Sequence, residues 1–234
     1  MPTLADALTW TRTGTDVFLA AATLDDASMA EPSLLPGWTR KHLIAHVAGN
    51  AEALGRLLTW AATGVETPMY TSREQRDADI ESGSARSATE LLDWARSSAE
   101  VFAEQADALD DDAWDALVRN GQGQQVAASV IPWLRARELY LHAADLGTTV
   151  TFADLPHDLL VAVCDGVAAQ RAGDDSPAVR LVATDGSGSW DLHTDLDLTE
   201  VHAPLAELAA YLTGRPHQAR LVSGEPAPEL SRWL

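Results

Sequence analysis

The sequence of 234 residues has a single cysteine, Cys164, and only 16 basic residues against 35 acidic ones. One cysteine cannot form an internal disulfide, which favours a reducing compartment. The net charge of −19 repels phosphate groups, so it argues against nucleic acid and anionic membranes as partners. No apolar run approaches the roughly 18 residues that span a bilayer, and residues 1–10 lack the pattern of a signal peptide. These absences predict a soluble cytoplasmic protein.

The hydrophobic fraction of 46% and the charged fraction of 22% are typical of a globular protein. The pattern of the chain changes near residue 150. Before it, Ala- and Leu-rich stretches have helical spacing, and after it helix and strand patterns alternate. The sequence therefore predicts two domains, 1–150 and 151–234.

Long helices are predicted in the first domain, and each begins at a residue that can cap it. Thr39 and Ser129 are predicted N-caps, and Ser87 with Glu90 has the spacing of a capping box. Helices of this length favour an antiparallel four-helix bundle. The predicted ranges are 3–24, 39–62, 87–108 and 129–146.

The pattern of the second domain predicts a mixture of helices and strands connected by glycine-containing turns. The whole chain therefore has the predicted fold class α+β, with a helical bundle followed by a small α/β domain. The predicted elements are a helix from Pro156 to about Gln170, strands at 178–183 and 189–194, a helix at 204–213 and a strand at 219–223.

The predicted helix 39–62 places a histidine, His46, on its apolar stripe, with His42 about 40° further round the helix. A lone histidine in such a place is most simply a core residue bonded to a backbone carbonyl. The spacing of His42 and His46 is that of a zinc protease helix, but Leu43 stands where the general base should be. Cys164 has no histidine in register with it, which indicates a buried structural thiol.

The predicted helix 129–146 changes that interpretation, because Glu138 and His142 lie one turn apart on its inward face, with Asp145 nearby. A glutamate in an apolar stripe needs a cationic partner, and Arg135 and Arg137 are predicted to lie away from this face. A metal ion would satisfy Glu138, His142 and His46 together and leave a position open, as in catalytic zinc sites. The same ligand set also suits iron. A buried ion pair between Glu138 and a histidine, without a metal, stays open as the alternative.

Two helix segments carry a resemblance to a known family. Leu35 to Asn50 (LPGWTRKHLIAHVAGN) and Arg137 to Gly147 (RELYLHAADLG) resemble the two motifs of the mycothiol-dependent maleylpyruvate isomerases. These motifs are shared by a wider superfamily of thiol-dependent enzymes, and shorter matches extend the resemblance over the whole chain. The shorter matches are the segments 66–70, 152–156, 214–215 and 232–234.

The resemblance implies a DinB-like four-helix bundle followed by a small α/β domain similar to sterol carrier protein. It implies that His46, Glu138 and His142 bind a divalent metal, usually zinc, and that Arg215 is a catalytic or substrate-binding residue. His42 lies outside that metal set. Gly49 departs from the pattern, since a larger residue is expected there.

The implied activity is the cis–trans isomerisation of maleylpyruvate to fumarylpyruvate in gentisate degradation. The thiolate of mycothiol, activated on the bound metal, would add reversibly to the double bond of this dicarboxylate-type substrate. We expect a monomer with a locally positive pocket, in which Asn50 and Asp145 are candidates for bonding to the metal ligands. Two alternatives remain: a mycothiol S-transferase acting on another electrophile, and a non-enzymatic zinc-binding regulatory module.

Overall fold

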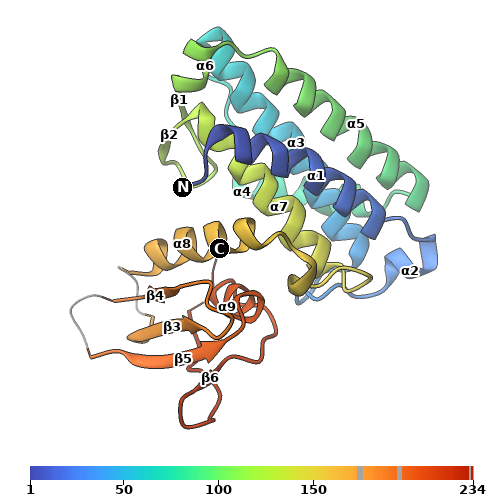
Figure 1. Cartoon of the computed structure of the whole chain (residues 1–234). Coiled ribbons are helices and arrows are strands. Elements are labelled where there is room, and N and C mark those ends of the chain that lie inside the picture. Colours follow the sequence, from blue (N-terminus) through green and yellow to red (C-terminus); the bar gives the residue numbers. More distant parts are fainter. Residues whose placement is uncertain (173–175, 194–196, 232, 234) are drawn as a thin grey trace. The chain divides into compact units, whose positions relative to one another are not determined.

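The computed structural model describes residues 1–172, 176–193, 197–231 and 233. The chain forms two compact units, Pro2–Val150 and Thr151–Leu234, and Met1 groups with the second. Figure 1 shows a helical first unit and, in the second, a sheet with helices. The predicted fold class, α+β, is confirmed. Within the described ranges, no helix is both long and apolar enough to cross a bilayer.

The first unit is built on four long helices close to the predicted ranges. In it, α3 packs against α4, α5 and α7, and α1 packs against α7. Shorter elements connect them, including a hairpin of two antiparallel strands. The elements are α1 (Leu4–Ala21), α2 (Asp26–Ala30), α3 (Arg40–Thr63), α4 (Arg73–Ser84), α5 (Ala88–Asp107), α6 (Asp111–Asp115), β1 (Leu117–Arg119), β2 (Gln125–Ala127), the 3₁₀ turn η1 (Ala128–Val130) and α7 (Ile131–Asp145).

Two predicted helix caps are confirmed and one is wrong. The Thr39 side chain accepts a hydrogen bond from the first turn of α3, and Ser87 and Glu90 form a reciprocal capping box on α5. Ser129 caps nothing, because the chain already turns in η1 and α7 begins without a side-chain cap. Ser129 therefore lies inside a 3₁₀ turn that leads directly into α7.

The bundle core consists of apolar side chains from all four long helices, in two clusters. Phe18, Leu43, Leu91 and Leu139 belong to one buried cluster, and α3, α5 and α7 share a second. Each such side chain contributes about 1.5–3 kcal/mol relative to exposure in water. This packing fixes α3 against α7, the two helices that carry His46, Glu138 and His142.

The helix α4 was not predicted from the sequence. Of its side chains and backbone, only Ile80 and Gly83 are buried, so it has no apolar stripe. Ser72 caps it by accepting a hydrogen bond from the Gln75 backbone at 3.1 Å. The local signal for this helix was therefore a Ser-x-x-Gln spacing, which is that of a capping box.

The second unit has a four-stranded sheet in the order β4-β3-β5-β6, with α8 and α9. The predicted helices and strands are present, and the turn at 185–188 joins antiparallel β3 and β4; Thr194, at the end of a predicted strand, lies outside the described residues. The strand β5 was missed, and it pairs in parallel with β3. The elements are η2 (Phe152–Asp154), α8 (His157–Arg171), β3 (Val179–Ala183), β4 (Ser189–Asp191), β5 (Thr199–Ala203), α9 (Leu205–Leu212) and β6 (Arg220–Leu221).

Candidate metal centre

Helices α3 and α7 bring His46, Glu138 and His142 together inside the bundle. The Nε2 atom of His46 lies 3.0 Å from Oε2 of Glu138, although the two residues are 92 positions apart in the chain. The Nε2 atom of His142, one turn further along α7, lies 3.2 Å from the same oxygen. The rings of His46 and His142 meet edge to face, with centroids 5.0 Å apart. One carboxylate oxygen therefore faces both histidine Nε2 atoms.

Burial and mutual hydrogen bonds shift the pKa values of these three side chains. Burial raises the pKa of Glu138, but hydrogen bonds from His142 and His46 outweigh it and hold that pKa well below its ordinary value. Burial lowers the pKa of His46 more than Glu138 raises it. The arrangement therefore holds an ionised carboxylate and, at neutral pH, an uncharged His46 imidazole with a lone pair to offer.

The donor atoms of these residues fit a divalent metal ion. All three ligand atoms lie within 4.8 Å of one another. In a tetrahedral zinc site with bonds of about 2.1 Å, neighbouring ligand atoms lie roughly 3.4 Å apart, which is close to the separations seen here. Two imidazoles and one carboxylate leave a fourth position open, as catalytic zinc sites do.

The ring nitrogen of His142 that faces away from Glu138 contacts Asp145. The Nδ1 atom of His142 lies 2.8 Å from Oδ2 of Asp145, whose side chain is only 1% exposed. Although burial lowers the pKa of His142, hydrogen bonds with Asp145 and Glu138 raise it above the ordinary value. A carboxylate behind a histidine is a common support for metal ligands, because it fixes the tautomer and the ring orientation.

The prediction that Arg135 lies away from the inward face of its helix is wrong. Arg135 is 1% exposed, and its Nη1 donates hydrogen bonds to the Val47 carbonyl at 2.7 Å and to Asn50 Oδ1 at 2.9 Å. It stands about 60° round the helix from Glu138, and its long side chain reaches across to α3. Burial lowers the pKa of Arg135 to about 10, and the charge of Glu138 opposes that shift. Asn50, predicted as a partner of the metal ligands, instead accepts a hydrogen bond from Arg135.

His42 has partners of its own. Its Nδ1 lies 2.7 Å from the Thr39 hydroxyl oxygen, and its Nε2 lies 3.2 Å from Glu81 Oε2. His42 therefore contributes to the cap of α3 and contacts the exposed Glu81, although it shares a helix with His46.

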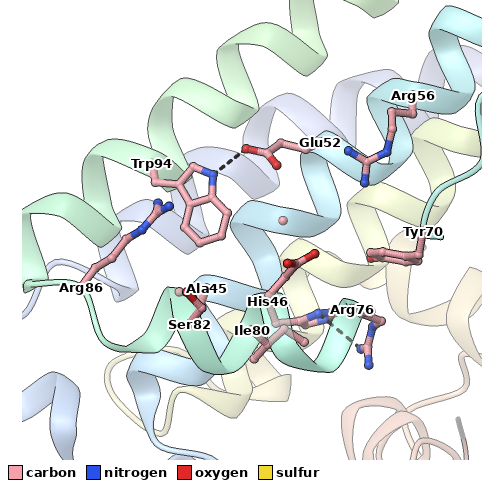
Figure 2. A pocket seen from close by; sticks show the side chains of 13 residues that line it. Ala45, His46, Glu52, Arg56, Tyr70, Arg76, Ile80, Ser82, Arg86 and Trp94 are labelled. Atoms are coloured by element: carbon pink, nitrogen blue, oxygen red, sulfur yellow. Dashed lines mark hydrogen bonds between the residues drawn. The ribbon is translucent and has the colours of Figure 1, made fainter. Parts of the chain in front are cut away.

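A cavity of about 310 Å³ opens beside the metal group, which is the set of His46, Glu138 and His142. The cavity reaches this group at His46. Figure 2 shows Tyr70 and Arg76 near His46, and Trp94 with Arg86 further along the cavity. Sequence reasoning missed this cavity because one of its walls is α4. The lining residues are Ala45, His46, Gly49, Glu52, Arg56, Tyr70, Arg76, Asp79, Ile80, Ser82, Gly83, Arg86 and Trp94.

Arg215 lies in the second unit, directly after α9. The chain turns at Gly214, which has a φ of 71°, and the Arg215 backbone N–H then donates to the Ala210 carbonyl at 2.8 Å. Its Nη1 donates to the Thr213 carbonyl at 2.7 Å, and its guanidinium carbon lies 5.7 Å from the ring centroid of Trp233. The catalytic or substrate-binding role of Arg215 stays a prediction.

A helical bundle that brings two histidines and a glutamate together from facing helices, followed by a small α/β unit, is consistent with the DinB-like superfamily. The family model described as the mycothiol maleylpyruvate isomerase N-terminal domain matches residues 10–147. This chain belongs to that family of enzymes, which confirms the resemblance seen in the sequence.

Two solved structures are similar to the chain along its whole length. They are crystal structures of the mycothiol-dependent maleylpyruvate isomerase and of a histidine-to-alanine mutant of that enzyme. Each is 36% identical in sequence with a TM-score of 0.91, over 100% of this chain and 98% of the other. A comparison with curated proteins gave no match.

Proposed function

We propose that this protein isomerises maleylpyruvate to fumarylpyruvate, with mycothiol as the thiol, in gentisate degradation. The observation that carries the proposal is the convergence of His46, Glu138 and His142 beside a cavity that His46 lines together with arginine side chains. Membership of the family and the likeness to the solved isomerase support the same activity.

The isomerisation requires a temporary loss of the double bond. The sulfur of the thiolate forms a bond to one alkene carbon, and the electron pair of the double bond moves onto the neighbouring ketone as an enolate. Rotation about the new single bond follows. The enolate then re-forms the ketone and the double bond, and the carbon–sulfur bond breaks to return the thiolate. No atom of the thiol is retained in the product.

The proposed cation is zinc, held by His46, Glu138 and His142. A bound zinc ion would lower the pKa of a coordinated thiol enough for the thiolate to form at neutral pH. Asp145 keeps His142 turned so that Nε2 faces the site, and the ionised Glu138 supplies negative charge to the cation. The protein's own thiol does not suit this role, because burial raises the pKa of Cys164 to about 12.

Arg215 is proposed to bind a carboxylate group of the substrate. A guanidinium can donate two parallel hydrogen bonds to one carboxylate, and it would also stabilise the negative charge that develops during addition. The single buried thiol is compatible with a reducing compartment, so we propose that the protein works in the cytoplasm. We also propose that it works as a monomer.

The test is the ultraviolet absorbance of maleylpyruvate mixed with the zinc-loaded protein, with and without mycothiol, followed by identification of the product. Catalytic formation of fumarylpyruvate that requires mycothiol but does not consume it is expected. A thiol adduct that accumulates would instead indicate an S-transferase. Metal binding without any thiol-dependent turnover would favour a regulatory zinc module.

A further inference from the structure

Arg76 on α4 is a cation at the edge of the metal group. Its Nη2 lies 3.5 Å from Nδ1 of His46, and its side chain is 29% exposed (Figure 2). Its other amino group, Nη1, lies 2.9 Å from Asp77, whose side chain is 61% exposed. Such exposed pairs contribute little stability, so Asp77 does little to hold the guanidinium in place.

The contact between Arg76 and His46 does not suit a loaded metal site. A histidine that binds a metal through Nε2 carries its proton on Nδ1, which then becomes a hydrogen-bond donor. A guanidinium has donors only. Two donors cannot bond to each other, so beside a metal-bound His46 the guanidinium of Arg76 is left with the Tyr70 phenol oxygen, to which it already donates, and with any acceptor that enters the adjoining cavity.

Arg56 lines the same cavity but is already occupied. Its Nε and Nη2 both donate hydrogen bonds to the carbonyl of Met69, at 3.0 Å for Nε. This interaction anchors the segment that presents the next residue, Tyr70. Arg56 therefore positions Tyr70, and Arg76 is left as the arginine at this end whose Nη2 can turn toward a ligand.

The Tyr70 phenol oxygen accepts a hydrogen bond from Arg76, which leaves the phenol O–H as a second donor for a ligand. Burial raises the pKa of Tyr70, and the positive charge of Arg76 opposes that shift in part. The phenol is therefore protonated at neutral pH and can donate its O–H. Figure 2 shows the Tyr70 ring and the Arg76 guanidinium at the same end of the cavity, with His46 beside them.

The acidic residues of the cavity have other partners. Oε1 of Glu52 accepts a hydrogen bond from the Trp94 indole at 2.6 Å, and Oδ1 of Asp79 accepts one from Gln75 at 2.8 Å. In a chain of net charge −19, an anion needs local positive charge, and Arg76 provides it next to the metal group.

We propose that Arg76 and Tyr70 form a carboxylate-binding subsite beside the metal group, with Arg76 as a substrate-binding residue for a short dicarboxylate. The inference rests on the proposed function for the identity of the substrate, but carboxylate binding can be measured without turnover. This subsite lies in the first unit and is separate from the role proposed for Arg215.

The experiment is calorimetric titration of the zinc-loaded protein with succinate, a four-carbon dicarboxylate that has no double bond to accept a thiol. Loss of a hydrogen bond between charged groups predicts binding about 10- to 100-fold weaker in Arg76→Gln. Arg76→Lys should recover part of the affinity, and Tyr70→Phe should lose less than Arg76→Gln. Arg73→Gln, an exposed arginine on the same helix, is the matched control and should bind like the wild type.

The zinc content and the kinetics separate binding from support of the metal site. We expect full zinc content in Arg76→Gln, a higher KM for maleylpyruvate and an unchanged KM for mycothiol. Unchanged succinate affinity in Arg76→Gln, or no succinate binding by the wild type, would overturn the proposal. Loss of zinc from Arg76→Gln would also overturn it, since Arg76 would then act through His46. Succinate binding that depends on Arg76 in a protein without isomerase activity would count against the proposed function and leave the subsite standing.

Discussion

Asp145 and His142 form a pair on one face of α7, with Oδ2 of Asp145 lying 2.8 Å from Nδ1 of His142. Because an ionised carboxylate only accepts hydrogen bonds, Asp145 keeps a proton on Nδ1, and the proton that a metal would displace is the one on Nε2. Nε2 lies 3.2 Å from Oε2 of Glu138, on the side where a metal would bind. Asp145 therefore sets the tautomer of a proposed metal ligand, although Asp145 is not among the residues that line the cavity.

Removal of Asp145 is predicted to weaken metal binding by about 10- to 100-fold, because His142 loses the group that orients it. Asp145→Ala tests this in a competition titration of zinc against a chromophoric chelator. Asp145→Asn keeps an acceptor oxygen and should lose less. Glu81→Ala removes the partner of His42 and is the matched control; an equal loss of zinc affinity in that variant would contradict the assignment.

The two histidines of α3 offer a second matched pair. His46→Ala is predicted to abolish stoichiometric zinc binding, because it leaves two protein ligands. His42→Ala should retain zinc, since the His42 ring contacts Thr39 and Glu81 instead. Elemental analysis of both proteins, purified without chelator, gives the answer. Zinc retained by His46→Ala would remove His46 from the ligand set, and absence of zinc from the wild type would favour a buried ion pair without a metal.

Zinc affinity is predicted to rise with pH through the pKa of His142. That pKa is raised above its ordinary value of 6.5, so the metal must displace a proton from His142 at any pH below the raised value. Affinity should increase about tenfold per pH unit in that range and level off above it. In the metal-free protein the sign is opposite, since the stability contributed by protonated His142 is lost as pH rises through the same pKa.

Zinc titrations between about pH 5.5 and 8.5 follow this dependence across the range in which histidines titrate. Asp145→Asn removes a charge that raises the pKa of His142, so the level region should begin at a lower pH. If the pH at which zinc affinity levels off is the same in Asp145→Asn as in the wild type, the displaced proton comes from another group.

The metal group was predictable because its residues interrupt apolar stripes. His46 stands among Leu43 and Val47, and Glu138 and His142 share a face with other inward residues, so helical periodicity alone brings them toward one core. Arg135 was misplaced by the same reasoning. Periodicity gives the direction of a Cβ atom, and a side chain as long as arginine can reach a neighbouring helix from the flank.

The cavity was not predictable in this way, because its wall is the polar helix α4. A helix with two buried residues leaves no periodic signal, and only its cap, Ser72, marks where it begins. In the sequence, Arg76 is therefore one arginine in a charged segment, and nothing marks it as a cavity residue. The missed strand β5 is a similar case, since its five residues are placed by pairing with β3 and not by local preference.

Gly49 gives a prediction about stability. A Cβ atom at this position would lie 3.9 Å from the Trp94 ring, which is an ordinary contact, and the residue is inside α3. Gly49→Ala should therefore stabilise the protein by about 0.5–1 kcal/mol, because alanine favours the helix. Gly14→Ala is the control, since its Cβ would lie 2.8 Å from the packed Tyr140 ring and should destabilise by about 1–3 kcal/mol. Urea unfolding measures both changes, and destabilisation by Gly49→Ala would contradict the contact described.

Arg215 supplies the last prediction, because it separates substrate binding from metal binding. Arg215→Ala is expected to lower kcat/KM for maleylpyruvate by about 100- to 1000-fold, since a charged donor to the developing negative charge is removed. Zinc content should stay at the wild-type level, because the predicted metal ligands all belong to the first unit. Arg220→Ala, an exposed arginine of the same unit that donates to the Gly224 carbonyl, is the control and should keep full activity. Undiminished turnover in Arg215→Ala would remove it from the reaction, and loss of zinc would mean that the residue supports the fold instead.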